Sequence, residues 1–121
     1  MKKAVFFYRT AAGKYPIEDI FDGLPGKAAQ KIIWVLSLLE DLEIVPSRYF
    51  AKLPGTNEIW ECRIGFASNA YRILCFLSGE SSVVLTHGFV KKKNKTPSSK
   101  IKKAEAFRKD YLNRKGRLER S

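Results

Sequence analysis

The segment from residue 49 to residue 90 constrains the fold of this chain most, because its pattern predicts a series of β-strands joined by short connections. Four stretches have the length of strands and are rich in β-branched and aromatic residues, namely 49–53, 58–64, 70–77 and 82–90. A Pro-Gly turn and two short loops connect them. Consecutive strands with such connections pair as antiparallel neighbours, so the sequence predicts an antiparallel meander.

The part of the chain before the meander is predicted to hold one strand and two helices. A strand is expected at Lys3–Tyr8 and a short helix at Ile17–Asp22, where the D-G-L-P sequence ends it. A second helix is expected from Pro25 to about Glu43, because apolar residues recur there at helical spacing: Ala28, Ile32, Val35, Leu39 and Leu42. We expect the two helices to form a hairpin that covers one face of the sheet.

A third helix is predicted after the meander, with Thr96 as its N-cap and Pro97 in its first turn. One side of this helix is nearly all lysine and arginine, and its apolar side consists of Ile101, Ala104, Phe107 and Tyr111. The tail 114–121 has few apolar residues, so we expect it to fray. A chain of 121 residues has the size of one domain. The sequence therefore predicts a single α+β domain over residues 1–121.

The net positive charge of the chain lies almost wholly in its second half. Residues 1–60 hold eight Lys/Arg and seven Asp/Glu, a net +1, whereas residues 61–121 hold fifteen and five, a net +10. Seven lysines and no acidic residue fall between Lys91 and Lys103. A surface that only had to be soluble would normally mix both signs. The asymmetry predicts a polyanionic partner, for which nucleic acid ranks before an acidic protein or a membrane surface.

Composition argues against membrane and metal-binding proteins. No run of about 18 apolar residues exists, so no membrane-spanning helix is expected. The apolar stretch 4–8 is too short for a secretory signal, so a cytoplasmic location is expected. Cys62 and Cys75 lie in predicted strands and are expected to pack, reduced, as small apolar groups. With one histidine beside them no zinc-type spacing can be written, so we expect neither a metal nor another cofactor.

Alternation along the strands separates charged from apolar residues in the meander. Glu61 and Arg63 point away from the apolar residues of their strand, and Arg72 points away from those of the next. We expect the faces that carry Arg63 and Arg72 to form one open surface, in a register that the sequence leaves unspecified. In the last strand, alternation places four residues on one side: Val83, Leu85, His87 and Phe89.

The last predicted strand delivers His87 and then a lysine-rich loop to the start of the third helix. His87 has an ordinary pKa near neutrality, so it is a candidate for proton transfer, against the alternative of a structural histidine. Lysines and arginines supply charge for phosphate. Such groups suit RNA cleavage by internal transesterification without a metal, because the RNA brings its own nucleophile, the 2′-OH. The candidate catalytic residues are Arg63, Arg72, His87, Lys91 and Lys92, and the candidate RNA-binding residues are Lys93, Lys95, Lys100, Lys102 and Lys103.

Glu61 stands two residues before Arg63, and two roles are open for it. Its carboxylate can act as a general base, or it can form a surface ion pair with Arg63 worth less than about 1 kcal/mol. We favour the ion pair.

Three strings together resemble one protein family. They are I-W-E-C-R at 59–63, Y-R-I-L-C-F at 71–76 and L-T-H-G-F-V-K-K at 85–92. The phage-derived, HigB-like branch of the RelE/ParE toxin superfamily typically has a W-E-x-R strand, a Y-R-I-x-x-F strand and an H-G-F-x-K-K…K-T-P segment in this order. The resemblance covers about residues 3–112.

This resemblance implies a β-α-α-β-β-β-α fold, in which a helical hairpin and a C-terminal helix pack on an antiparallel sheet. It also implies a toxin that cleaves mRNA on the ribosome, so that mRNA, ribosomal RNA and a helix-turn-helix antitoxin are the expected partners. By motif position Arg63 and Arg72 match phosphate-stabilising residues, and Lys91 and Lys92 match the basic pair after the final strand. His87 matches the histidine of H-G-F. Two alternatives stay open: a ParE-like toxin that inhibits DNA gyrase, and a non-catalytic RNA-binding or inert phage-derived module.

Overall fold

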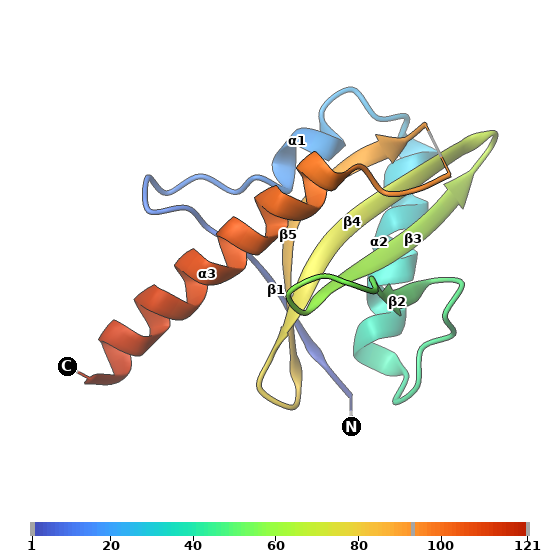
Figure 1. The fold of residues 1–121 in the computed structure, drawn as a ribbon. Coiled ribbons are helices and arrows are strands. Elements are labelled where there is room, and N and C mark those ends of the chain that lie inside the picture. The colour runs from blue at the N-terminus through green and yellow to red at the C-terminus, as the bar shows by residue number, and fades with distance from the viewer. Residues whose placement is uncertain (1, 93, 121) are drawn as a thin grey trace.

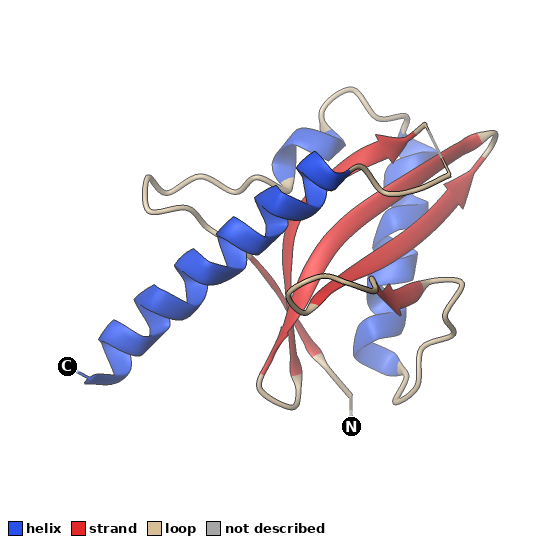
Figure 2. Ribbon diagram, viewed as in Figure 1, coloured by secondary structure: helices blue, strands red, loops and turns tan. Residues whose placement is uncertain are grey.

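The computed structural model describes residues 2–92 and 94–120, the last four of these by their backbone alone. Within them the chain forms five strands and three helices (Figures 1 and 2), in the order β1 (Ala4–Phe7), α1 (Glu18–Phe21), α2 (Gly26–Asp41), β2 (Phe50–Lys52), β3 (Ile59–Phe66), β4 (Asn69–Ser78), β5 (Ser82–Lys91) and α3 (Ser98–Arg120). The predicted α+β class is confirmed. The order contains one strand more than the β-α-α-β-β-β-α pattern, because residues 50–52 form a short strand of their own.

The five strands form one mixed sheet in the order β1-β5-β4-β3-β2. Strands β2 to β5 are the antiparallel meander that the sequence predicts. The expectation of a wholly antiparallel sheet is wrong, because β1 runs parallel to β5, with Val5 opposite Val83. Backbone hydrogen bonds hold the two strands together: the Tyr8 N–H donates to the carbonyl oxygen of Leu85 over 2.8 Å. Residues 8–81 separate β1 from β5, so no turn between them dictates their relative direction.

Helices α1 and α2 cover one face of the sheet, and α2 lies behind β3 and β4 in Figure 1. The predicted apolar stripe is buried at Ala28, Ile32, Val35 and Leu39, each of which is 0% exposed. Leu42 lies just past the end of α2 and is 37% exposed. Burial of an aliphatic side chain of the size of Leu or Ile stabilises a fold by about 1.5–3 kcal/mol. This face is therefore the main apolar core.

Helix α1 approaches β5 so closely that the strand needs a glycine at the point of contact. A Cβ atom added to Gly88 would lie 2.6 Å from Cδ1 of Ile20. This contact shows that the Cβ position of Gly88 faces α1. The side chains of its neighbours His87 and Phe89 therefore point to the other face of the sheet.

Helix α3 crosses the opposite face of the sheet, as Figure 1 shows. It buries Ala104 completely and packs Ile101, Phe107 and Tyr111 against the sheet. The helix begins at Ser98, and the carbonyl oxygen of Pro97 accepts hydrogen bonds from the N–H groups of the first turn. Thr96 is therefore not the N-cap that the sequence predicts. In the described part of the chain, no helix is both long and apolar enough to cross a membrane.

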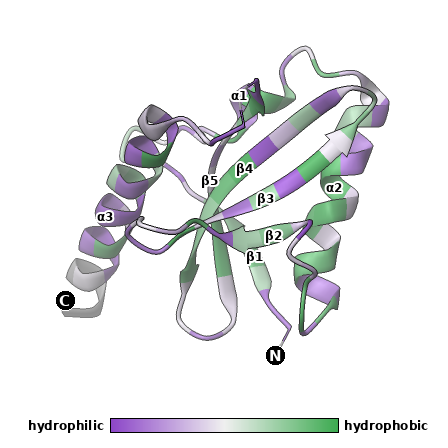
Figure 3. Ribbon diagram, turned by 45° about the vertical axis from the view of Figure 1, so that its right-hand side comes forward, coloured by the Kyte–Doolittle hydropathy of each residue, from purple (hydrophilic) through white to green (hydrophobic). Residues whose placement is uncertain are grey.

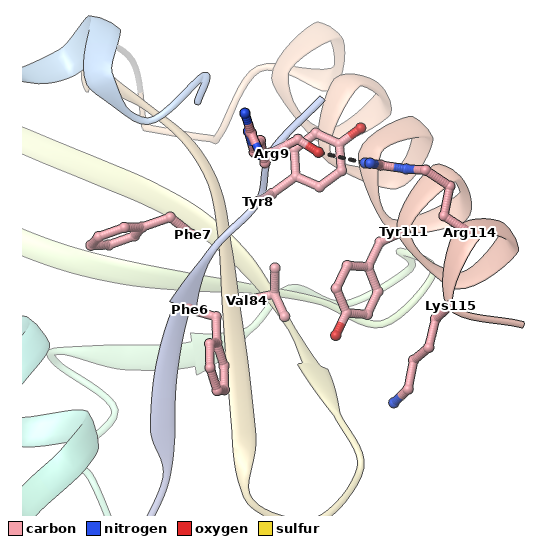
Figure 4. A pocket seen from close by; sticks show the side chains of 8 residues that line it. All are labelled: Phe6, Phe7, Tyr8, Arg9, Val84, Tyr111, Arg114 and Lys115. Carbon is pink, nitrogen blue, oxygen red and sulfur yellow. Dashed lines mark hydrogen bonds between the residues drawn. The ribbon is translucent and has the colours of Figure 1, made fainter. Parts of the chain in front are cut away.

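The C-terminal half of α3 is fastened to the end of β1 (Figure 4). The Tyr8 ring stacks on Phe107 with centroids 4.7 Å apart, and the Tyr8 hydroxyl donates to Asp110. Arg114 pairs with Asp110 over 2.7 Å and donates to the carbonyl oxygen of Arg9. These contacts hold α3 against the sheet as far as Arg114, and the helix continues to Arg120.

Candidate functional site

A β-bulge in β5 determines which side chains share the α3-facing side of the sheet. Leu74 of β4 lies opposite His87, but the next residue, Cys75, lies opposite Leu85, so Thr86 is the extra residue. The Thr86 hydroxyl donates to the carbonyl oxygen of Leu74 over 2.9 Å. The bulge reverses the alternation: Val83 and Leu85 face α1 and α2, whereas His87 and Phe89 face α3. The prediction that these four residues share one side is wrong for this reason.

Arg63 and Arg72 lie directly opposite each other on β3 and β4, so the surface that the sequence predicts for them is confirmed. Glu61 lies between them. Its Oε1 atom is 3.1 Å from Nε of Arg63 and 3.0 Å from Nε of Arg72. The contact with Arg72 is an ion pair whose geometry does not meet that of a hydrogen bond. The predicted Glu61–Arg63 ion pair is present, but it is not a surface pair, because Glu61 is only 1% exposed.

The two arginines differ in their access to solvent. The Arg63 side chain is 36% exposed and donates from Nη1 to the carbonyl oxygen of Ser47, whereas the Arg72 side chain is 14% exposed. Burial lowers the pKa of Arg72 from its ordinary value, and the charge of Glu61 opposes this shift. Guanidinium stays charged throughout the physiological range. With one carboxylate for two guanidinium groups, the cluster keeps a net positive charge.

The loop after β5 is tied to this cluster by Thr96, whose hydroxyl donates to the second carboxylate oxygen of Glu61. A hollow of about 570 Å³ lies between this loop, the start of α3 and Phe89. Lys92 and Lys95 line it, together with Lys100, whose ammonium is 5.7 Å from the centre of the Phe89 ring. Because Phe89 lies opposite Arg72 in the sheet, this hollow adjoins the arginine pair.

The remaining predicted lysines are more dispersed. Lys91 ends β5 opposite Ala70 and is half-buried. Lys102 and Lys103 are exposed on α3. Figure 3 shows that α3 is largely hydrophilic and that hydrophilic positions interrupt the apolar stretches of β3 and β4. Lys93 lies outside the residues that the structure describes.

A second hollow, of about 360 Å³, adjoins the other side of the arginine pair. Arg63 and Arg72 line it together with Lys31 of α2, Arg48 and Tyr49. None of the described residues that line this hollow is acidic. Sequence reasoning missed Lys31 and Arg48, because they come from the half of the chain with almost no net charge.

His87 is only 3% exposed, so the structure does not bring it to the open surface of Arg63 and Arg72. Its ring meets Phe107 of α3 edge-on, with centroids 5.8 Å apart, and Nδ1 lies 3.2 Å from the Thr86 hydroxyl. Nε2 has no hydrogen-bond partner among the described residues. Burial lowers the pKa of His87 to about 4, and Lys103 and Lys100 add to the shift. The imidazole is therefore neutral at pH 7.

Cys62 and Cys75 lie in the apolar core, with their sulfur atoms 4.0 Å apart and no disulfide between them. Burial raises the pKa of the Cys75 thiol well above its ordinary value. The prediction that they pack as reduced apolar groups is confirmed. Among the side chains that the structure describes, at residues 2–92 and 94–116, no three His, Cys, Asp or Glu side chains gather as metal ligands would.

The sequence of this chain matches the family described as "Phage derived protein Gp49-like (DUF891)" over residues 19–109. The matched stretch runs from α1 into α3 and contains both arginines, His87 and the lysine loop. No curated protein matches the chain. The family match covers well over half of the 121 residues. The chain therefore belongs to the Gp49-like family of phage-derived proteins, a RelE/ParE-type toxin family of toxin–antitoxin systems.

Proposed function

We propose that this protein is a HigB-like toxin, an endoribonuclease that cleaves mRNA on the ribosome and arrests translation. One observation carries the proposal: Arg63 and Arg72 lie side by side and line a cationic hollow, while Lys92 and Lys95 line another beside it. Two fixed guanidinium groups suit a phosphate better than they suit a protein surface, because each offers a planar fork of donors to phosphate oxygens.

The chemistry that fits these residues is internal transesterification of RNA. The ribose 2′-OH gives its proton to solvent and attacks the adjacent phosphorus, the bond from phosphorus to the 5′-oxygen breaks, and that oxygen takes up a proton, so that the products carry a 2′,3′-cyclic phosphate and a 5′-OH. The transition state places extra negative charge on the phosphate oxygens. Arg63 and Arg72 are assigned to stabilise that charge, a contribution worth on the order of 100-fold in rate for a single donor.

Proton transfer is assigned to Lys91 and Lys92 rather than to Glu61 or His87. The Glu61 carboxylate already contacts both arginines and Thr96, and His87 lies under α3. Lys91 and Lys92 are assigned to hold the phosphate and to protonate the leaving 5′-oxygen. His87 is assigned a positioning role, as a neutral ring that holds β5 and α3 together.

The proposed partners are mRNA and ribosomal RNA, which the lysines of the 91–103 segment would contact through phosphates, and a helix-turn-helix antitoxin. An antitoxin partner is what membership of a toxin–antitoxin family suggests. The positive surface would hold RNA by a largely electrostatic, salt-dependent attraction.

Induction of the protein in cells, followed by primer extension on several mRNAs, tests this function. We expect new 5′ ends inside translated reading frames, and their loss when initiation is blocked. DNA damage without new mRNA ends would instead indicate a gyrase inhibitor. Normal growth with intact mRNA would indicate a non-catalytic module, and either result would overturn the proposal.

A further inference from the structure

Trp34 lies on the surface of α2, where the apolar core does not require an aromatic ring. The residue is 45% exposed. The Lys31 ammonium lies 4.9 Å from the centre of its ring, and the Tyr49 ring meets it edge-on at 5.5 Å. Arg48 in turn places its guanidinium 4.9 Å from the centre of the Tyr49 ring. Two cations and two rings therefore form one cluster.

This cluster is continuous with the arginine pair. Lys31, Arg48 and Tyr49 line the same hollow as Arg63 and Arg72, and Trp34 contacts this wall through Lys31 and Tyr49. The backbone holds the arrangement in place, because the Arg63 N–H donates to the carbonyl oxygen of Tyr49 over 2.8 Å. An RNA strand that leaves the arginine pair in this direction would reach the tryptophan next.

We propose that Trp34 is a stacking platform for a nucleobase that flanks the cleaved bond, with Lys31 and Arg48 holding its phosphates. The proposal rests on the proposed function, since it extends the same RNA site. Proteins that bind single-stranded RNA combine a positive groove with aromatic rings on which bases stack, and guanidinium groups add cation–π attraction. The flexible Lys31 side chain can pass its ammonium from the ring to a phosphate while a base takes its place.

Charge favours RNA over a protein as the occupant of this platform. Interfaces between proteins are depleted of lysine at their centres, whereas Lys31 lies against the Trp34 ring and none of the described residues that line the adjoining hollow is acidic. Ile33, the neighbour of Trp34 in α2, is 59% exposed and does not line the hollow of the arginine pair, so it serves as the matched control.

Tryptophan fluorescence tests the platform directly. The chain has two tryptophans, so Trp60→Phe leaves Trp34 as the single reporter; Trp60 stacks on Phe50, and phenylalanine preserves that stacking. The probes are a short 2′-O-methyl oligoribonucleotide, which cannot be cleaved because its 2′-oxygens are blocked, and an abasic strand of equal charge. We expect the first to quench the fluorescence and the second to bind more weakly without quenching.

Affinity for a dye-labelled form of the same oligonucleotide gives the second measurement. Trp34→Ala should weaken binding about tenfold, the effect of one lost base–aromatic stack, whereas Trp34→Tyr and Ile33→Ala should bind nearly as the original protein does. Thermal unfolding of each variant checks that the fold is kept.

The outcomes separate the platform from the proposed function. Absence of quenching, or equal affinity of Trp34→Ala and the original protein, overturns the platform even if mRNA is cleaved in cells. The same holds if Trp34→Ala weakens only the binding of an antitoxin, which would make the cluster a protein-docking surface. Quenching and a loss of affinity on Trp34→Ala, in a protein that cleaves no mRNA, would support the platform and overturn the nuclease.

Discussion

The two faces of the sheet are built from the same strands but differ in what they bury. Among the described residues, the buried cluster on the face toward α1 and α2 consists of apolar side chains, the two cysteines and Tyr71. The face toward α3 is apolar at one end but carries Glu61, Arg63, Arg72 and His87 on the same three strands. The first face stabilises the domain, and the second holds charges at fixed positions. Strict alternation in β3 and β4 allows one sheet to do both.

Removal of Glu61 should give the largest change in stability, because it deletes the buried negative charge that lies between Arg63 and Arg72. Glu61→Ala leaves Arg63 and Arg72 facing each other without a carboxylate and removes the acceptor of Thr96. Loss of one partner of a buried ion pair costs about 3–5 kcal/mol, and the partial exposure of the arginines favours the lower end. Urea unfolding measures the change.

Glu58→Ala is the matched control for Glu61→Ala. Glu58 also pairs with a cation, Lys52, over 3.0 Å, but both side chains are largely exposed, so its loss should cost less than about 1 kcal/mol. If the two variants lose equal free energy of unfolding, the buried cluster does not support the α3-facing side as described.

The next largest effect concerns pH and His87. The pKa of His87 is lowered to about 4 in the folded protein, against about 6.5 in the unfolded chain. Between these values only the unfolded chain binds the proton, so the free energy of unfolding should fall as the pH falls from about 6.5 toward about 4. The part due to His87 is about 2 kcal/mol at pH ~5.

His87→Leu isolates this contribution, because carboxylates titrate over part of the same range. The variant should lose less stability than the original protein between neutral pH and pH ~5, by about 2 kcal/mol. Parallel stability curves for the two proteins would show that His87 is accessible to protons in the folded state, and hence available for proton transfer.

The sequence predicted the apolar face well and the polar face in part. Period-2 alternation in β3 and β4 is uninterrupted, so it correctly assigned Arg63 and Arg72 to one surface. It failed in β5, because a bulge such as that at Thr86 has no residue signature and shifts every later side chain to the other face.

Two other features depend on contacts between distant parts of the chain. Lys31 and Arg48 reach the arginine hollow from α2 and the loop that follows it, and no motif relates them to β3 and β4. The burial of His87 follows from the docking of Phe107 in α3. Only the three-dimensional packing reveals that the single histidine is buried under α3 and does not lie on the surface that carries Arg63 and Arg72.

Cleavage of mRNA by arginine variants in induced cells tests whether the α3-facing arginine pair is the reacting centre. Primer extension should show cleavage reduced on the order of 100-fold or more for Arg72→Ala and for the more exposed Arg63→Ala. Lys52→Ala, which removes an exposed cation of β2 outside both hollows, should cleave as the original protein does. Thermal unfolding identifies any variant that fails to fold. Full cleavage by folded Arg63→Ala and Arg72→Ala proteins would show that the arginine pair is not the reacting centre.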